Sequence, residues 1–307
     1  MSLFAPPEVI ETEVFVDLPS NFRTRRERTV WADTNRAGQA IDSFLEGPAF
    51  DADGNLYVVD IPWGRIFRIT PAGATSLIAE YDGEPNGLKI HRDGRIFVAD
   101  YKNGIMLLDP DTGSVTPWCD RYRLERFKGC NDLIFGAAGE MYFTDQGQTG
   151  HQDPTGRVFR LSPDGRLDCL IDTIPSPNGI AIDPSGKIVY VAVTRANAVW
   201  RMPMMADGGV SKVGTFIQLS GGGGPDGMAM TADGGLLVSH VGMGCIWVFD
   251  KLGQPRWRVN SCTGLSTTNV AFGGPENRTL YITESETGTI LRAELPVPGL
   301  MLFSHQA

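Results

Sequence analysis

A six-fold internal repeat is the feature that most constrains how this chain can fold. The stretch "PNGLKIHRDGRIFVAD" from Pro85 recurs as "PNGIAIDPSGKIVYVAV" from Pro177 and as "PDGMAMTADGGLLVSH" from Pro225. Three looser copies carry the same phase, and the polar residues that lead the six copies are Glu46, Asn86, Asn131, Asn178, Asp226 and Asn269. Their spacing of about 40–48 residues is typical of a β-propeller, in which each repeat forms one four-stranded blade.

Each copy also has the pattern of a β-hairpin. After Asn86, "GLKI" reads as a strand, "HRDG" as a turn with an Asp-Gly signal, and "RIFVAD" as the return strand. We therefore predict an all-β, six-bladed β-propeller whose four-stranded antiparallel blades surround a central metal-containing channel. A single domain is expected over residues 1–307, with repeats that start near 46, 86, 131, 178, 226 and 269. A strand within residues 1–45 is expected to close the last blade.

Charge and cysteine usage narrow the classes of partner. The net charge of −9 gives no basic stripe for a nucleic acid to bind. The sequence has no apolar run of membrane-spanning length and no signal-peptide pattern at its start, so neither a membrane nor secretion is expected. Five cysteines without CxxC pairing favour reduced thiols and a cytoplasmic location. The oligomeric state is left open.

The repeat predicts two sets of residues at one mouth of the propeller. The first strand of each blade lines the channel, so the six leading polar residues are expected to form a ring around the axis. The return strand brings its last residue back to the same end. This second set comprises Asp60, Asp100, Asp145, Val193, His240 and Glu284. Converging carboxylates repel one another unless a cation or protons compensate, so the mouth is expected to bind a cation.

Within the ring, Glu46, Asn131, Asn178 and Asp226 supply two carboxylates and two amide carbonyls. An all-oxygen set of this kind suits a hard divalent ion, Ca²⁺ foremost, with Mg²⁺ and Mn²⁺ as alternatives. Asn-Gly and Asp-Gly are also ordinary turn dipeptides, so the same residues could simply cap the strands. All six repeats carry a polar residue at this position, which favours a metal site over simple capping of the strands.

The motifs resemble those of a known family. "FLEGPAFDADGNLYVVD", "KGCNDLIFGAAGEMYFTD" and "GPDGMAMTADGGLLVSH" are similar to signature segments of the gluconolactonase family, also called the regucalcin or senescence-marker family, and the resemblance extends over residues 40–295. It implies a six-bladed propeller with one catalytic divalent metal, and many members hydrolyse sugar lactones. It also implies that Glu46, Asn178 and Asp226 bind the metal, and that Asn131 completes the metal shell or contacts substrate. Zn²⁺ and iron are further candidate ions.

The substrate side differs from the family at one position. Animal members carry an arginine two residues before the position of Asn131, where this chain has Gly129, and Lys128 is the candidate substitute. The rim of the mouth is expected to include Trp63, Tyr101 and residues 146–156. Among the second set, Asp145 and His240 are candidate substrate ligands, although a histidine there could equally satisfy a hydrogen bond in the core.

These observations predict a metal-dependent hydrolase that opens a lactone ring, with a small-molecule lactone as its partner. Asp226 is the expected proton acceptor for the attacking water. A phosphotriesterase-like hydrolase is the alternative enzyme, because the same polarising chemistry serves a P=O group. A metal- or ligand-binding propeller without catalysis is the other alternative. No role is assigned to Asn86, Asn269 or the C-terminal segment from Pro296.

Overall fold

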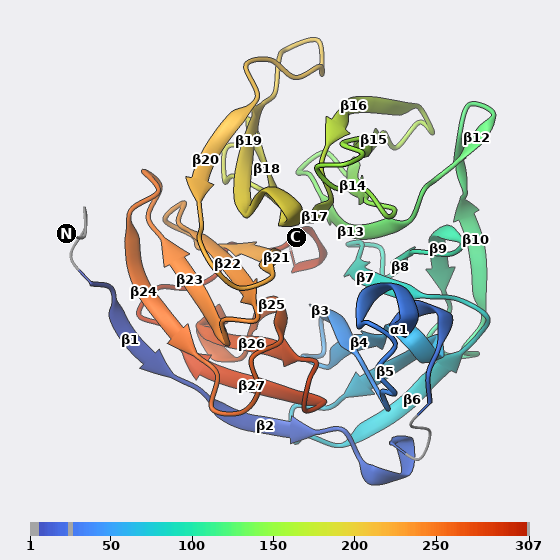
Figure 1. Ribbon diagram of the computed structural model, residues 1–307, viewed down its shortest axis with the longest axis vertical. Coiled ribbons are helices and arrows are strands. Elements are labelled where there is room, and N and C mark those ends of the chain that lie inside the picture. Colours follow the sequence, from blue (N-terminus) through green and yellow to red (C-terminus); the bar gives the residue numbers. More distant parts are fainter. Residues whose placement is uncertain (1–5, 24–26, 306–307) are drawn as a thin grey trace.

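The chain folds as a six-bladed β-propeller. The computed structural model describes residues 6–23 and 27–305, and its main sheets are arranged in a ring around a central axis (Figure 1). The sheets are antiparallel and follow one another along the chain, so each sequence repeat supplies the innermost strands of one blade. The predicted fold class is confirmed. No helix among the described residues is long and apolar enough to cross a membrane.

Blades 1 to 3 are formed by the first half of the chain. Blade 1 consists of β3 (Leu45–Phe50), β4 (Leu56–Asp60), β5 (Arg65–Ile69) and β6 (Thr75–Glu80). Blade 2 consists of β7 (Pro85–Ile90), β8 (Ile96–Asp100), β9 (Gly104–Leu108) and β10 (Val115–Cys119). A small hairpin of β11 (Arg121–Tyr122) and β12 (Glu125–Arg126) leads into blade 3. Blade 3 consists of β13 (Cys130–Phe135), β14 (Met141–Asp145), β15 (Gly156–Leu161) and β16 (Leu167–Ile174).

Blades 4 to 6 use both ends of the chain. Blade 4 consists of β17 (Pro177–Ile182), β18 (Ile188–Val193), β19 (Ala198–Pro203) and β20 (Gly214–Gln218). Blade 5 consists of β21 (Gly224–Met230), β22 (Leu236–Val241), β23 (Cys245–Phe249) and β24 (Pro255–Asn260), to which β1 (Glu8–Glu11) adds a fifth, parallel strand. Blade 6 consists of β25 (Thr267–Gly273), β26 (Thr279–Glu284), β27 (Thr289–Glu294) and the N-terminal β2 (Glu13–Asp17). The two N-terminal strands therefore join the last two blades.

The hairpin register differs by one residue from the simple prediction. Asp60 pairs with Leu45, the residue before Glu46, and the register then shifts between Glu46 and Ala49. The same irregularity follows the start of the first strand in the other blades. Because paired residues share one face of a sheet and neighbours alternate, the last residue of the return strand lies on a different face from the ring residue.

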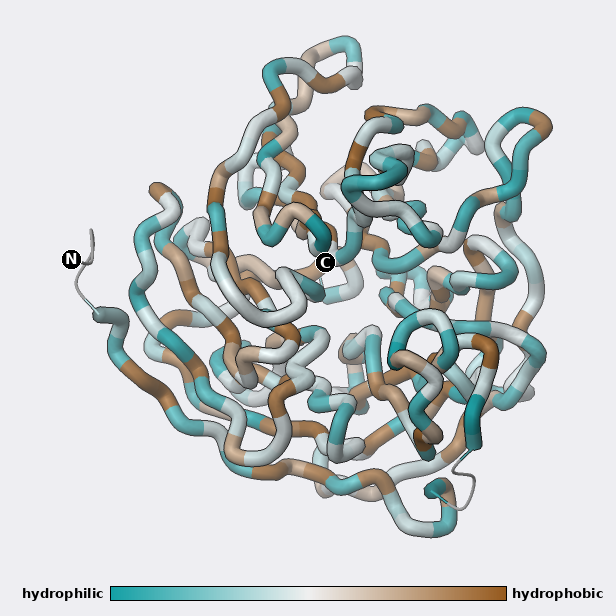
Figure 2. The backbone as a smooth tube through the Cα atoms, viewed as in Figure 1, coloured by the Kyte–Doolittle hydropathy of each residue, from teal (hydrophilic) through white to brown (hydrophobic). Residues whose placement is uncertain are grey.

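The core consists of apolar layers between neighbouring blades. One cluster joins blades 3 and 4, and it includes Val158, Ile180 and Val191, all fully buried. Figure 2 shows hydrophobic and hydrophilic residues alternating along many strands, as expected when one face of a strand contacts the core. At some positions next to the axis, neighbouring blades approach so closely that a side chain would not fit. A β-carbon on Gly47, which has a φ of +55°, would lie 2.6 Å from the backbone oxygen of Asn86.

Non-repeating segments cover the two ends of the channel. At one mouth, α1 (Val30–Asn35) lies in front of the inner strands of blades 1 and 2 (Figure 1). Short 3₁₀ turns occur at η1 (Ser20–Phe22), η2 (Ile61–Trp63), η3 (Thr194–Ala196), η4 (Pro275–Asn277) and η5 (Phe303–His305).

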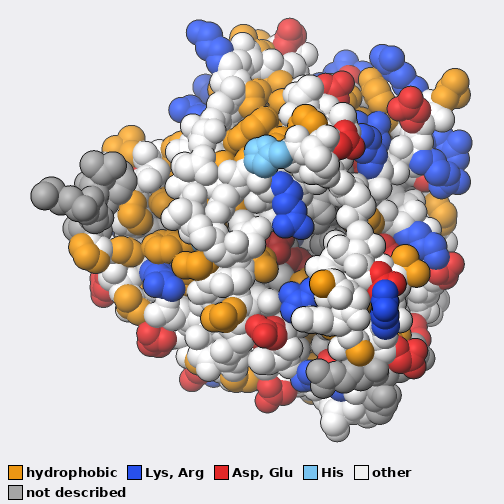
Figure 3. All heavy atoms as spheres, viewed as in Figure 1, with side chains coloured by type: hydrophobic (Ala, Val, Ile, Leu, Met, Phe, Trp, Pro, Cys, Tyr) orange, Lys and Arg blue, Asp and Glu red, His pale blue; other side chains and the backbone are white. Residues whose placement is uncertain are grey.

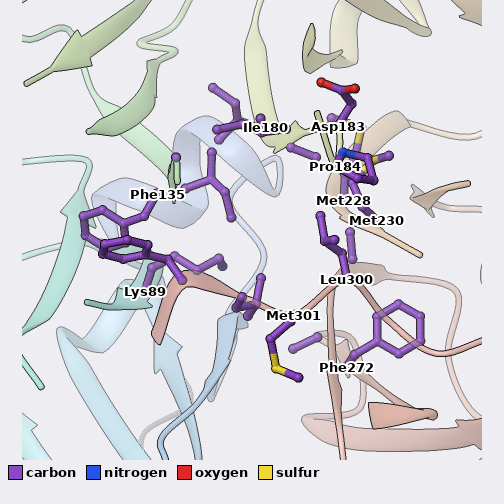
Figure 4. A pocket seen from close by; sticks show the side chains of 18 of the residues that line it. Lys89, Phe135, Ile180, Asp183, Pro184, Met228, Met230, Phe272, Leu300 and Met301 are labelled. Atoms are coloured by element: carbon purple, nitrogen blue, oxygen red, sulfur yellow. The ribbon is translucent and has the colours of Figure 1, made fainter. Parts of the chain in front are cut away.

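The opposite mouth is covered by the C-terminal segment. Leu300 donates a backbone hydrogen bond to Met230, and Phe303 contacts the rings of His91 and Phe135. Leu300 and Met301 line a small cavity of about 120 Å³ together with Met228, Met230 and other apolar side chains. Figure 4 shows Leu300 next to Met230 in this cavity. The described part of this segment, residues 296–305, thus packs on the propeller, a role that the sequence left open.

Candidate active site

The predicted ring of polar residues comes together at the mouth beside α1. Five of its six members line one cavity of about 600 Å³, namely Glu46, Asn86, Asn131, Asn178 and Asp226. The sixth, Asn269, lies behind Glu46, and its amide nitrogen donates a 2.8 Å hydrogen bond to Glu46 Oε2. Figure 3 shows the hollow at the centre of this face. A cavity of this size can hold a small organic ligand.

Glu46 is held rigidly at the base of the cavity. Its Oε2 accepts hydrogen bonds from the backbone nitrogen of Gly47 at 2.6 Å and from Asn269 at 2.8 Å. Burial raises the pKa of Glu46 to about 8, an effect that these two hydrogen bonds only partly offset. The carboxylate is therefore costly to ionise in the protein without a nearby cation.

The pKa of Asp226 is also raised, and by more causes than that of Glu46. Burial is the largest cause of its raised pKa, and the negative charges of Glu46 and Asp132 add to it. The side chain of Asn178 donates a hydrogen bond that opposes the shift. Because the charge of Glu46 raises the pKa of Asp226, the two carboxylates lie within electrostatic reach of each other, and a divalent cation between them would compensate both charges.

The amides complete an oxygen donor set. Asn131 Nδ2 donates to Gln146 Oε1 at 3.1 Å, which leaves the carbonyl oxygen of Asn131 free to face the cavity. The amide nitrogen of Asn178 likewise donates a hydrogen bond to Asp226. The described residues hold no cluster of three or more Asp, Glu, His or Cys side chains arranged for a metal, so amide oxygens are needed in any metal shell here. Two carboxylates and two amide oxygens fit a hard divalent ion.

The second set of residues is not arranged around the cavity. Asp145 is fully buried, accepts a 2.8 Å hydrogen bond from the backbone of Gly129 and forms an ion pair with Arg157 at 2.6 Å. His240 is also buried, and its Nδ1 accepts a hydrogen bond from Trp247 Nε1 at 3.1 Å. Burial lowers the pKa of His240, which favours the neutral ring. Both residues anchor strand ends, and their predicted contact with substrate stays a prediction.

The predicted rim residues occupy different places. Tyr101 lines the cavity, and its hydroxyl accepts a 2.7 Å hydrogen bond from Gln148. A β-carbon on Gly129 would lie 2.7 Å from the Tyr101 ring, so Tyr101 occupies the space that a side chain at position 129 would need. Lys128 is exposed, and its ammonium group bonds to the hydroxyl of Thr155. Trp63 is half-buried in η2 and does not line the cavity.

Several cavity residues were missed by the sequence interpretation. Trp31, Asn35 and Arg36 come from the segment of α1, which lies outside the repeats. Arg195 lies two residues after Val193, the last residue of β18, and Tyr101 directly follows Asp100, the last residue of β8. Its position after a return strand could therefore have identified Arg195 as a rim residue. Residues in α1 had no comparable signal, because no repeat predicts where that segment packs.

Comparisons with known proteins agree with this geometry. Residues 44–286 match the family model described as the SMP-30/Gluconolactonase/LRE-like region. The chain is 32% identical over 231 residues to lactonase drp35 of Staphylococcus aureus strain USA300, covering 69% of this chain and 68% of that protein. It is 31% identical over 281 residues to a gluconolactonase of Zymomonas mobilis, covering 81% and 78%.

Solved structures share the same fold. A crystal structure titled as a putative gluconolactonase aligns with a TM-score of 0.74 at 26% identity, over 84% of this chain and 91% of that one. A structure from Agrobacterium tumefaciens strain C58, titled as the calcium-binding protein regucalcin, aligns with a TM-score of 0.77 at 21% identity, over 98% and 100%. The chain belongs to the SMP-30/gluconolactonase/LRE-like family.

Proposed function

We propose that this protein is a metal-dependent lactonase that opens the ring of a sugar lactone. The observation that carries the proposal is the pair of carboxylates, buried Glu46 and half-buried Asp226, set among amide oxygens at the base of an open cavity. The family and the named relatives, a lactonase and a gluconolactonase, support the reaction class. The donor set of two carboxylates and two amide oxygens supports metal dependence.

The residues that would hold the ion are Glu46, Asn131, Asn178 and Asp226. Ca²⁺ is our first choice, because all four donors are oxygen atoms, and the neighbour titled as calcium-binding agrees with it. Zn²⁺, Mn²⁺, Mg²⁺ and iron are the alternatives. A divalent ion, when bound, polarises a carbonyl oxygen and lowers the pKa of water.

Asp226 is the residue that we propose to accept the proton of the attacking water. It faces the cavity, and the neighbouring carboxylates make its protonated form more stable than that of an ordinary aspartate. Glu46 already receives two hydrogen bonds on one oxygen, so it is better suited to hold the ion than to exchange protons. Tyr101 and Gln148, bonded to each other at the rim, are placed to contact the hydroxyl groups of a sugar ring.

Metal analysis combined with a substrate panel tests the proposal. We expect about one tightly bound divalent ion per chain and complete loss of lactone hydrolysis after chelation, restored when the ion is added back. Aryl phosphotriesters in the same panel test the alternative chemistry, and we expect lactones to be the better substrates. Full lactone turnover by protein shown to be metal-free by elemental analysis would refute the metal-dependent reaction.

A further inference from the structure

Two arginines from outside the ring line the same cavity as its carboxylates. Arg36 follows α1 directly, and Arg195 lies within η3 after the end of β18. The charge of Arg195 acts on Asp226, which places the guanidinium group near the ring. Figure 3 shows Lys or Arg side chains on both sides of the central hollow. Positive charge is therefore present above the carboxylates.

Both arginines are carried by well-anchored turns. Trp31 on α1 packs on Phe44 with ring centroids 4.7 Å apart, and the guanidinium carbon of Arg36 lies 5.6 Å from the same Phe44 ring. On the other side, Thr194 donates a 2.8 Å hydrogen bond to the backbone of Pro225, the residue before Asp226. The backbone beneath each guanidinium group is thus tied to the base of the cavity.

Neither arginine forms an ion pair with any residue that the structure describes. Buried arginines elsewhere have carboxylate partners, as Arg65 has in Asp60 and Arg157 has in Asp145. The side chain of Arg195 is exposed to the cavity mouth and that of Arg36 is half-buried. The guanidinium donors of both residues are available to a ligand.

The charge balance of the loaded site leaves this positive charge uncompensated. Ionised Glu46 and Asp226 carry two negative charges, and a divalent ion carries two positive charges. Asp132, whose charge acts on both carboxylates, is offset by the ammonium group of Lys89 at 3.8 Å, so the ring with its ion is neutral. Two unpaired arginines then remain at the entrance of a chain whose net charge is −9. Guanidinium groups bind carboxylates and phosphates through strong charge-assisted hydrogen bonds.

We propose that Arg36 and Arg195 bind an anionic substituent of the substrate, so that this lactonase prefers lactones that carry a carboxylate or a phosphate group. The inference rests on the proposed function. The lactone carbonyl would face the ring, and the anionic group would lie at the rim between the two arginines. Each arginine is then a specificity-determining residue for the charged end of the substrate.

Kinetics on matched lactones test the inference. The Ca²⁺-loaded protein is assayed with glucono-1,5-lactone, which is neutral, with a glucarolactone, which carries a carboxylate, and with 6-phosphoglucono-1,5-lactone, which carries a phosphate. The variants are Arg36→Gln, Arg195→Gln and the double variant. Arg201→Gln is the control, because Arg201 is an exposed residue on β19 outside the cavity and its replacement removes the same charge.

We expect wild-type kcat/KM to be higher for a charged lactone than for the neutral one. Each cavity variant should lose about 10–100-fold in kcat/KM on the charged lactone, as expected for one charge-assisted hydrogen bond. The neutral lactone should be affected much less, and Arg201→Gln should behave as wild type on all substrates. The charged lactone with the larger arginine-dependent loss identifies carboxylate or phosphate as the preferred group. Equal losses on charged and neutral lactones would overturn the inference, because the arginines would then act on the carboxylate that hydrolysis generates.

A binding experiment separates this inference from the proposed reaction. Tetrahydropyran-2-carboxylate and the neutral tetrahydropyran-2-methanol share a ring and cannot be hydrolysed as lactones. Calorimetry should show tighter binding of the carboxylate to the Ca²⁺-loaded wild type, lost in the double arginine variant and kept in Arg201→Gln. If no lactone is hydrolysed, the proposed reaction fails, and this binding result still decides the role of the arginines. Equal affinity of the two compounds for the wild type would refute the anion site.

Discussion

The two carboxylates of the ring differ in what surrounds them. Glu46 accepts two hydrogen bonds from protein donors on one oxygen and faces the negative charge of Asp132, whereas Asp226 accepts one from Asn178 and faces the negative charges of both Glu46 and Asp132. A hydrogen-bonded carboxylate favours its ionised form, and one near other carboxylates favours its protonated form. We therefore expect the two residues to contribute differently to metal binding and to proton transfer.

The first prediction compares Asp226→Asn with Glu46→Gln. Both variants keep an oxygen ligand and should bind the ion more weakly. Excess metal should restore much of the activity of Glu46→Gln. Asp226→Asn should remain about 10²–10⁴-fold slower in kcat at saturating metal, because its proton acceptor is missing. Steady-state kinetics across a metal titration measure both effects, and full rescue of Asp226→Asn would make Asp226 a ligand only.

The second prediction concerns Asn269, which does not line the cavity but donates a hydrogen bond to Glu46. Asn269→Ala removes the 2.8 Å hydrogen bond that orients Glu46, so metal affinity should fall about 10–100-fold, as for other residues that orient a metal ligand. Asn86→Ala is the matched comparison, because Asn86 lines the cavity and is not among the described residues that donate a hydrogen bond to Glu46 or Asp226. Metal titration by calorimetry should show a much smaller change for Asn86→Ala. Equal weakening in both variants would contradict the orienting role of Asn269.

At the scale of elements, the inner strands meet so closely at the axis that each blade positions the next. A β-carbon on Gly179 would overlap the backbone oxygen of Asp226, the ring residue of the following blade. The glycine after the ring residue is therefore required by packing between blades as well as by the turn-like motif. This contact explains why "NG" and "DG" recur at the start of the inner strands.

The third prediction uses that contact. Gly179→Ala should lower the free energy of unfolding by about 1–3 kcal/mol through overpacking, and it should also weaken metal binding by displacing Asp226. Gly214→Ala on β20 is the control, because a β-carbon there meets no atom within 4 Å. Chemical denaturation and metal titration of the two variants give the comparison. Unchanged metal affinity in a destabilised Gly179→Ala would show that Asp226 does not move with its blade.

At the scale of the whole molecule, the site exists only when the ring of blades is closed. The cavity draws its ring residues from five blades, and blade 6 supplies Asn269 behind Glu46. Blade 6 is itself completed by β2 from the N-terminal region, so both ends of the chain contribute to closure. Folding thus gathers buried carboxylates that are far apart in the sequence, and their repulsion is part of the free energy of the folded state.

The fourth prediction follows from the pKa of Glu46, which is raised from 4.5 to about 8 in the folded protein. A folded-state pKa above the unfolded value means that the folded protein holds the proton more tightly. The contribution of this group to stability is therefore fully present below about pH 4.5 and is lost as the pH rises through about 8. Metal-free protein should lose stability as the pH rises from about 4.5 to about 8, and the raised pKa of Asp226 acts in the same direction.

Thermal denaturation with a chelator, from about pH 5 to about pH 9, tests the direction of this dependence. Added Ca²⁺ should flatten the curve by stabilising the ionised carboxylates, and Glu46→Gln should flatten it without metal. A midpoint that rises through this range in the metal-free wild type would contradict the prediction.

The repeat predicted much of the fold and the ring. The spacing of Glu46, Asn131, Asn178 and Asp226 placed them at equivalent positions of different blades, and the structure brings all four to one cavity. The prediction for the second set was less accurate, because its residues lie at the ends of the return strands but do not line the cavity. Asp145 follows the predicted hairpin but pairs with Cys130, because the register shifts after that pair, and it bonds to Arg157 instead of facing the cavity. A shift of one residue has no signature in the sequence, yet it moves a side chain to another face.

The sequence by itself determined the features that recur with the repeat: six blades, strand order within each hairpin, and a polar ring at the axis. These features follow from local patterns, since hydrophobic alternation and turn residues act within one hairpin. Only the tertiary structure decided what covers the two mouths. The packing of Trp31 on Phe44 sets the place of Arg36, and contacts of Phe303 with His91 and Phe135 set the C-terminal segment. Those positions depend on contacts between distant residues, which no local period records.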